Sequence, residues 1–384
     1  MAGRPPVLVD SSPQLKDAAR ELAGAERYYL DTEFDLSASS RRLCLIQVSR
    51  GEKVFLVDTM RLTALEPLAE AISRPEAEWV LHSGGQDVAW LRDALKLSAL
   101  PRLFDTQVAW GLLGPEYPVS LAYLFYRILG IRSAKEQQAA DWKVRPLTND
   151  QIAYAADDVE HLPEIRAWLA ERLAKLDRLA MVHDVSTEMT ASEAPEPLSL
   201  ADFRNAWQLD AAGQAALLFL IGWHNGLSPA EKRTAPYSKT LLLLAKMLPE
   251  TGAELSRIRG VPFEWARREG DAFCGKLLRA SAGASGKDFV PLEPPPYNTF
   301  ERIRAEGWIR SATAEVTAEL GLAPELSFPG RVMKRMTDAV VEKGSREAAA
   351  DALEGWRAPL LRAPLRARAA AARPPAGAPE AGSP

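Results

Sequence analysis

Cysteine is scarce in this chain of 384 residues, which contains Cys44 and Cys274 and no other thiol. Two thiols so far apart exclude a disulfide framework and a cysteine-based zinc site, and they fit a reducing cytoplasm. None of the 4 histidines stands at metal-ligand spacing from another. No apolar run reaches the ~18 residues that a membrane span needs, and the first residues lack the apolar stretch of a signal peptide. We therefore expect a cytoplasmic protein without membrane association.

The composition is otherwise that of a globular protein, with 47% hydrophobic and 26% charged residues. The net charge of −4 conceals an asymmetry, because residues 1–198 carry −8 and residues 199–384 carry +4. An acidic half joined to a basic half would suit a cation-requiring site beside a surface that binds a polyanion. Chance segregation of surface charge explains the same numbers, and composition alone does not separate the two interpretations.

Polar, proline-bearing segments predict how the chain is divided. One break spans Asp184 to Ser199, and a second spans Ser281 to Tyr297. The end is rich in Ala, Pro and Arg, which is typical of a frayed tail. The predicted parts are residues 1–183, a linker at 184–198, a unit at 199–282, a second unit at 298–360 and a disordered tail at 361–384.

The first part alternates predicted strands and helices. Three runs rich in strand-forming residues, 28–34, 43–49 and 54–58, are separated by short polar segments, as in an antiparallel meander. A helical pattern follows, then a returning strand at 79–82, and helical patterns fill most of 86–183. This order predicts an α/β domain with a mixed sheet. The two later units show no convincing strand and are predicted to be all-α bundles.

Two acidic residues lie together on the first predicted strand. Asp31 and Glu33 are two apart, so the period of a strand places them on one face, while Leu30 and Thr32 face the other way. An ordinary solvent-facing pair would have the same spacing. The pair is therefore a candidate site only in combination with other acids.

Three further positions are candidates because local structure places them well. Asp87 opens a helix after two glycines, where a favourable interaction with the helix dipole is the alternative role. Thr148 and Gln151 form a capping box that marks the start of a later helix. On that helix Tyr154 and Asp158 are four apart and share a face, although a core tyrosine beside a solvated acid is the alternative.

Other polar residues nearby are expected to be structural. Asp105 precedes a helix and reads as its N-cap. His82 ends a strand, and a packed or hydrogen-bonded histidine is favoured there over a catalytic one. Asp157 is turned about 100° away from Asp158 around the helix, so only one of the two can point into a given site.

The candidate acids together predict a metal site. Clustered carboxylates repel one another unless protons or cations compensate, and oxygen-rich sites suit Mg²⁺ or Mn²⁺. Two such ions about 4 Å apart can activate water and stabilise a leaving alkoxide on phosphorus. No other cofactor is expected.

The motifs, in their order along the chain, resemble those of the ribonuclease D family in the DEDD exonuclease superfamily. They are DTEF at 31–34, LCLIQVS at 43–49, HSGGQD at 82–87, FDTQVAWGLLG at 104–114, KEQQAADWKVRPL at 135–147 and YAADDVEHL at 154–162. The resemblance covers nearly all of residues 25–183 and implies an RNase H-like fold. It also implies hydrolytic removal of nucleotides from RNA 3′ ends.

The resemblance assigns a role to each candidate residue. Asp31 would bridge both divalent ions, Glu33 and Asp158 would complete the site of the ion that binds the attacking water, and Asp87 would help to hold the second ion. Tyr154 would orient the nucleophile by a hydrogen bond. A phenol with a pKa of about 10 is a poor base at neutral pH.

The helical units resemble the HRDC domains of the same family. Residues 199–282 are similar to one HRDC domain, and residues 298–360 to a second, degenerate copy, which implies an auxiliary role in binding nucleic acid. A purely structural cap is the alternative. The expected partner is RNA with a free 3′ end, such as a tRNA precursor, with no obligate protein partner evident. An exonuclease acting mainly on DNA and a catalytically silent RNA-binding scaffold remain rival hypotheses.

Overall fold

The computed structural model describes residues 5–37, 40–62, 64–132, 140–191, 197–232, 234–283, 292–293 and 298–371. The chain divides into two compact units. One comprises residues 1–193 together with 300–384, and the other comprises residues 194–299. Motif residues 135–139 of the predicted resemblance lie outside the described ranges, as does the end of the chain from residue 372.

The first unit contains a six-stranded mixed sheet in the order β1-β4-β3-β2-β5-β6. Its strands are β1 Val7–Val9, β2 Arg27–Ser37, β3 Ser40–Ser49, β4 Val54–Asp58, β5 Glu78–Leu81 and β6 Arg102–Asp105. Strands β2, β3 and β4 form the antiparallel meander that the sequence predicts, and β5 returns parallel to β2. Strands β1 and β6 were not predicted, because each is a short edge strand with too few residues to show a period.

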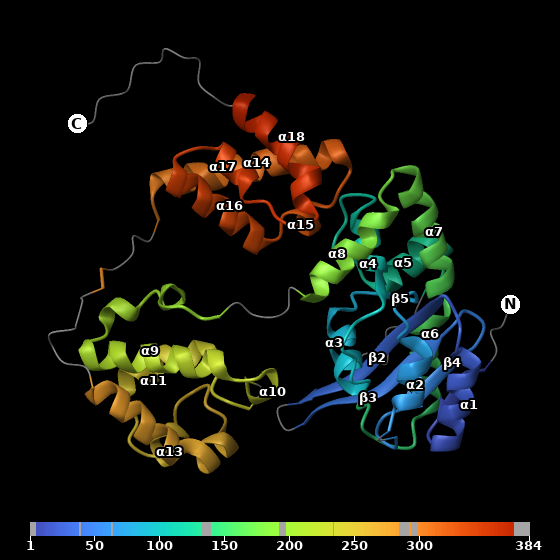
Figure 1. The fold of residues 1–384 in the computed structure, drawn as a ribbon, viewed down its shortest axis with the longest axis horizontal. Helices are drawn as coiled ribbons and strands as arrows, with labels where there is room; N and C mark the ends of the chain where they lie inside the picture. Colours follow the sequence, from blue (N-terminus) through green and yellow to red (C-terminus); the bar gives the residue numbers. More distant parts are fainter. Residues whose placement is uncertain are drawn as a thin grey trace. The chain divides into compact units, whose positions relative to one another are not determined.

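Helices cover both faces of the sheet (Figure 1). One face packs against α1 Ser12–Leu22, α2 Glu66–Ile72 and α3 Gly85–Ala94. The other packs against α4 Thr106–Gly111, α6 Asn149–Glu160, α7 Leu162–Lys175 and α8 Leu179–Ala191, with α5 Leu121–Leu124 and the π-helical turn η1 Phe125–Leu129 beside them. Residues of β2 therefore alternate between two cores, with Tyr28 and Leu30 in one and Tyr29 in the other.

Helix α8 corrects the predicted linker. The helix continues to Ala191, so residues 184–191 are not a linker. Val182, Val185 and Ser186 are buried at helical spacing, and the Ser186 hydroxyl accepts a hydrogen bond of 3.0 Å from the backbone N–H of Asp105. A serine in the apolar stripe hid the helical period from the sequence pattern, because its burial depends on a partner on β6.

The C-terminal helices share a core with the sheet domain. They are α14 Phe300–Leu320, α15 Pro324–Ser327, α16 Gly330–Lys343, α17 Glu347–Asp351 and α18 Arg357–Ala371. Buried residues such as Leu326 and Leu361 belong to the same cluster as Trp110 and Val185. The N–H of Ala323 donates to the carbonyl of Gly111 at 2.8 Å. These helices therefore lack the core of their own that a separate unit would have.

Helix α18 also corrects the predicted tail, since it extends to Ala371. Leu361, Leu365 and Ala369 are buried one turn apart, although Pro364 stands inside the helix. Alanine and arginine are strong helix formers, so an Ala/Arg-rich composition is compatible with a helix once one stripe is covered. Of the predicted tail, only the residues from 372 onward lie outside the described ranges.

The other compact unit, residues 194–299, is all-α among its described residues, as predicted, and has its own core. Its helices are α9 Ala211–Gly226, α10 Pro229–Lys232, α11 Leu241–Met247, α12 Gly252–Leu255 and α13 Phe263–Ala282, with short 3₁₀ turns at η2 Leu200–Asp202, η3 Ala206–Gln208 and η4 Ser238–Thr240. Trp265 and Phe273 on α13 pack edge to face with their ring centroids 5.0 Å apart. No helix among the described residues is long and apolar enough to cross a membrane.

Candidate active site

The two acids of β2 lie where that strand extends beyond its neighbour. Strand β2 pairs with β5 only from Arg27 to Tyr29, so Asp31 and Glu33 follow the last paired residue on that side. On the other side they face Gln47 and Leu45 of β3. The strand is therefore held firmly along one edge, while the other edge leaves space beside the acids.

Helix α6 brings Asp158 to the same place. The capping box of Thr148 and Gln151 that the sequence predicts starts this helix. Carboxylate oxygens of Asp31, Glu33 and Asp158 all lie within 4.8 Å of one another, from segments more than a hundred residues apart in sequence. Asp157 is exposed and does not line the pocket, as the helical geometry predicts.

Asp87 lies at the edge of this group, in the first turn of α3. Its Oδ1 accepts a hydrogen bond of 2.5 Å from the Thr32 hydroxyl, which points to the opposite face of β2 from Asp31. Asp87 is not within the 4.8 Å group, but its charge raises the pKa values of Asp31 and Glu33. The structure thus gathers three of the acids tightly and places the fourth beside them.

A tight turn before α3 sets the position of Asp87. A β-carbon on Gly84 would come 2.7 Å from that of Leu81, so no larger residue fits there without movement. The Asp105 carboxylate accepts hydrogen bonds from the backbone N–H groups of Ser83 at 3.0 Å, Gly84 at 2.8 Å and Gln107 at 2.8 Å. Asp105 is therefore the predicted N-cap of α4 and also fastens the turn that leads to Asp87.

The predicted site residues all line a single pocket of about 590 Å³. They are Asp31, Glu33, Asp87, Tyr154 and Asp158. His82 also borders it, but its Nδ1 is 2.9 Å from the Thr106 hydroxyl and its Nε2 is 3.0 Å from the Val119 carbonyl oxygen. Both ring nitrogens are engaged, so the structural role that the sequence favours for His82 is confirmed.

Burial and mutual repulsion raise the pKa values of the clustered acids. Burial, reinforced by Asp158 and Asp87, raises the pKa of Glu33 from 4.5 to about 8. Burial raises the pKa of Asp158 to about 7 and that of Asp87 to about 6. The pKa of Asp31 lies well above its usual range, because it is buried and faces the other three acids. The cluster is thus costly to ionise unless positive charge is supplied.

Tyr154 retains its proton in this environment. Burial and the neighbouring carboxylates of Asp158, Glu33 and Asp31 raise the pKa of its phenol well above the usual value. The rings of Trp142 and Tyr154 lie 6.1 Å apart between centroids. Tyr154 can therefore orient a group by donating a hydrogen bond, but it cannot act as a base at neutral pH.

The donor set fits a divalent cation. Three carboxylates supply hard oxygen ligands at one point, which is what Mg²⁺ and Mn²⁺ prefer. The side chain of Gln47 is fully buried, and among the described residues neither its Nε2 nor its Oε1 has a hydrogen-bond partner. It stands opposite Asp31 on the neighbouring strand. The region beside Asp31 thus contains clustered carboxylates without a compensating cation among the described residues, and the Gln47 amide without a hydrogen-bond partner.

Two residues around the site were not singled out by the sequence reasoning. The signal for Gln47 was a lone amide within the apolar run LCLIQVS. Arg145 is the second, and it fastens the segment that carries Trp142. Its Nε donates to Asp58 at 2.5 Å, its Nη2 donates to Asp58 at 2.8 Å, and its Nη1 donates to the Trp142 carbonyl at 2.7 Å.

Substitution of Arg145 by alanine should destabilise the protein strongly. Asp58 is 1% exposed, so the change leaves a buried carboxylate without its bidentate partner, at a cost of about 3–5 kcal/mol in the free energy of unfolding. Equilibrium denaturation measures this loss. Lys96→Ala is the control, because its ion pair with Glu66 is fully exposed to solvent and contributes little to stability. Equal losses in the two variants would contradict the assigned role.

Comparisons with known proteins agree with this geometry. The sequence profile of a family described as 3′-5′ exonuclease matches residues 6–174. A ribonuclease D of Pseudomonas paraeruginosa is 29% identical over 342 residues, covering 85% of this chain and 88% of that protein. A ribonuclease D of Gluconacetobacter diazotrophicus is 31% identical over 294 residues, covering 74% of this chain and 73% of that protein.

A solved structure has the same fold. The chain superposes on Escherichia coli RNase D, an exoribonuclease involved in structured RNA processing, with a TM-score of 0.75. The two share 23% sequence identity, and the match covers 96% of this chain and 98% of that one. The predicted RNase H-like α/β fold with a mixed sheet, followed by a helical region, is thereby confirmed.

The fold and the acidic pocket define a 3′-5′ exonuclease, a class that depends on divalent metal ions. The chain belongs to the ribonuclease D family. It is a 3′-5′ exoribonuclease, as the sequence predicts, and the rival hypotheses of a DNA-directed enzyme and a silent scaffold are not favoured.

Proposed function

We propose that the protein removes nucleotides one at a time from free 3′ ends of RNA with the help of two divalent cations, Mg²⁺ or Mn²⁺. We further propose that it trims structured precursors such as tRNA. The observation that carries the proposal is the convergence of five side chains on one pocket, three of them with carboxylate oxygens within 4.8 Å. The processing of structured RNA by Escherichia coli RNase D supports the choice of substrate.

Each acid has a part in the proposed reaction. Asp31, Glu33, Asp87 and Asp158 would hold the cations, with Asp31 shared between them because the other three acids surround it. When bound, the cations supply the positive charge that lowers the pKa of the attacking water and stabilises the leaving oxygen. Thr32 keeps the Asp87 carboxylate in place by its hydrogen bond.

Tyr154 would orient the attacking water. Its Oη keeps its proton, because burial and the adjacent carboxylates raise its pKa. The apolar side chains of Phe34, Leu121 and Trp142 line the same pocket and would contact the terminal sugar and base.

The helical regions would hold the body of the RNA. We assign residues 199–282 to an HRDC domain and residues 298–360 to a second, degenerate copy, following the resemblance of their sequences. Lys and Arg on such units bind phosphates without reading sequence. We also place the protein in the cytoplasm, where its two buried free cysteines would stay reduced.

End-labelled substrates test the polarity and the substrate class. With Mg²⁺ or Mn²⁺, a 3′-labelled RNA strand should release labelled mononucleotide at once, while a 5′-labelled strand should shorten as a ladder. A DNA strand of the same sequence should react more slowly, because it lacks the 2′-hydroxyl. Internal fragments from RNA, or faster release from DNA, would contradict the proposal.

A further inference from the structure

A buried amide stands directly across from Asp31, the centre of the acidic group. Strands β2 and β3 run side by side (Figure 1), and their register pairs Gln47 of β3 with Asp31 of β2. The side chains of directly paired residues lie on the same face of a sheet, with β-carbons about 4.5–5.5 Å apart. Gln47 therefore lies on the face that carries the acids, one strand behind Asp31.

Packing does not account for the amide of Gln47. The side chain is 0% exposed, and neither its Nε2 nor its Oε1 has a hydrogen-bond partner among the described residues. A buried amide without a partner costs stability, because it gives up its hydrogen bonds to water. Methionine or leucine would fill a similar volume in the otherwise apolar run LCLIQVS without that cost. An amide at this position therefore needs a reason other than packing.

The surroundings of Gln47 offer the Asp31 carboxylate as its polar neighbour. The other residue directly paired with Gln47 is Leu56 of β4, which is apolar. On β3 the flanking side chains of the same face are Leu45 and Ser49, and the Ser49 hydroxyl already accepts a hydrogen bond of 2.9 Å from a backbone N–H. Helix α6 packs over these strands, and its buried residues beyond the capping box are apolar.

We propose that Gln47 is a positioning residue for the reaction, whose amide N–H donates a hydrogen bond to the Asp31 carboxylate when that carboxylate serves as a metal ligand. The terminal torsion of a glutamine side chain is broad, so the amide can turn toward the carboxylate without movement of either strand. A carboxylate has about four acceptor sites, so one can take this bond while others face a cation. The inference rests on the role in cation binding that we propose for Asp31.

The expected effect falls on metal binding and not on RNA binding. Metal-binding carboxylates are commonly held by a hydrogen-bond donor behind them, and loss of the donor lowers metal affinity or activity about 10- to 100-fold. Gln47 is fully buried and does not line the pocket of about 590 Å³, so its side chain does not reach the RNA. Its loss should therefore leave the affinity for RNA unchanged.

Gln47→Met tests this role, because methionine keeps the length of the side chain and removes both polar atoms. Gln214→Met is the matched control, since the Nε2 of Gln214 is likewise buried without a described partner, in the compact unit of residues 194–299. The affinity of the full-length protein for Mn²⁺ alone is measured from the electron paramagnetic resonance signal of the free ion. We expect about 10- to 100-fold weaker binding for Gln47→Met and wild-type affinity for the control.

Hydrolysis of labelled RNA separates positioning from a general loss of structure. At limiting Mg²⁺ the kcat of Gln47→Met should fall by about 10- to 100-fold while the KM for RNA stays at the wild-type value, and additional Mg²⁺ should restore the rate. Wild-type Mn²⁺ affinity in Gln47→Met would overturn the proposal, and so would an equal loss in Gln214→Met.

Thermal midpoints in chelator test whether the amide stabilises the fold instead. Gln47→Met and Gln47→Leu should melt at or above the wild-type temperature, because each removes an unsatisfied buried amide. If methionine alone fits poorly, Gln47→Leu carries the same expectation for Mn²⁺. Midpoints well below the wild type in both variants would show a structural role and would overturn the proposal.

Failure of this inference is distinguishable from failure of the proposed function. Wild-type protein that binds Mn²⁺ and hydrolyses RNA, with Gln47 variants that do so equally well, would overturn only the role of Gln47. Wild-type protein that binds no Mn²⁺ would overturn the proposed cation site, and this inference with it.

Discussion

Asp31→Asn should abolish the release of nucleotides from RNA 3′ ends while leaving the fold and RNA binding largely intact. Asp31 is surrounded by Asp87, Asp158 and Glu33, so its carboxylate is the centre of the acidic group. Asparagine keeps the shape but removes the charge that would attract a divalent ion. Because such an ion supplies several kcal/mol of transition-state stabilisation, we expect a loss of about a thousandfold or more.

Single-turnover hydrolysis of a labelled RNA strand measures this effect. Asp157→Asn is the matched control, because it makes the same chemical change on an exposed acid that does not line the pocket. The control should hydrolyse RNA at the wild-type rate. Wild-type turnover by purified Asp31→Asn protein would contradict the assignment of the site.

Glu33→Gln should stabilise the metal-free protein at pH 8 although it inactivates the enzyme. The pKa of Glu33 is raised in the folded state, from 4.5 to about 8, so folding favours its protonated form. The stability that this group contributes is present below about pH 4.5 and is lost as the pH rises through 8. Glutamine is neutral at every pH and avoids that loss, which is on the order of a few kcal/mol.

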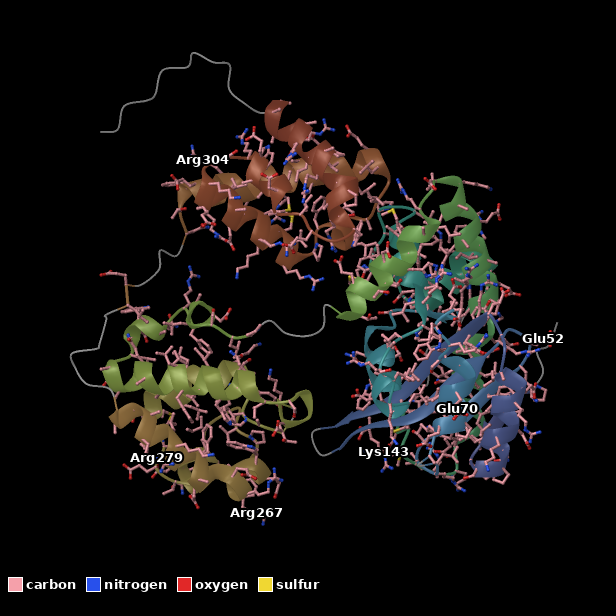
Figure 2. All side chains as sticks on the ribbon, viewed as in Figure 1. Glu52, Glu70, Lys143, Arg267, Arg279 and Arg304 are labelled. Carbon is pink, nitrogen blue, oxygen red and sulfur yellow. The ribbon has the colours of Figure 1, made fainter. Side chains whose placement is uncertain are left out.

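Thermal midpoints in chelator at pH 5 and pH 8 test this prediction. We expect Glu33→Gln to raise the midpoint by about 5 °C at pH 8 and by much less at pH 5. Mg²⁺ should raise the wild-type midpoint at pH 8, because it supplies the missing positive charge. Glu70→Gln, an exposed acid labelled in Figure 2, should change neither value. A lower thermal midpoint for Glu33→Gln than for the wild type at pH 8 would contradict the claim that the ionised Glu33 carboxylate destabilises the metal-free protein.

The positions of the candidate residues could be predicted where local periodicity determines them. The alternation of β2 places Asp31 and Glu33 on one face, and the turn of α6 separates Asp158 from Asp157. Both arguments need only the geometry of a single element. The acid-bearing face of β2 meets the acid-bearing face of α6 only because α6 packs against the sheet. The family resemblance implied this packing, whereas the geometry of a single element could not predict it.

What the sequence pattern missed depends on contacts between distant elements. The Thr32 hydroxyl holds Asp87 across 55 positions of sequence, and Arg145 reaches Asp58 across 87. Ser186 is tolerated in the core because its hydroxyl oxygen accepts a hydrogen bond from the backbone N–H of Asp105 on β6. In each case a polar residue has a partner that no local period reveals, so residues 184–191 of α8 were mistaken for a linker and the anchor role of Arg145 was not seen.

Whether the whole chain divides functionally into a nuclease and two HRDC domains stays a prediction. The core observed in the structure unites residues 300–371 with the sheet domain and gives residues 194–299 a core of their own. Arg178 illustrates this union, since its Nη1 donates to the Leu112 carbonyl at 2.8 Å and to the Gly321 carbonyl at 3.3 Å. The C-terminal helices therefore contribute to the stability of the nuclease whatever RNA they contact.

The central claim is that the repulsion among Asp31, Glu33, Asp87 and Asp158 is relieved by divalent cations, without which no phosphodiester is cleaved. The most direct test is the rate of nucleotide release from labelled RNA after exhaustive removal of metal, followed by titration with Mg²⁺ or Mn²⁺. We predict no release from the stripped protein and full recovery on titration. Undiminished release by the stripped protein would contradict the account.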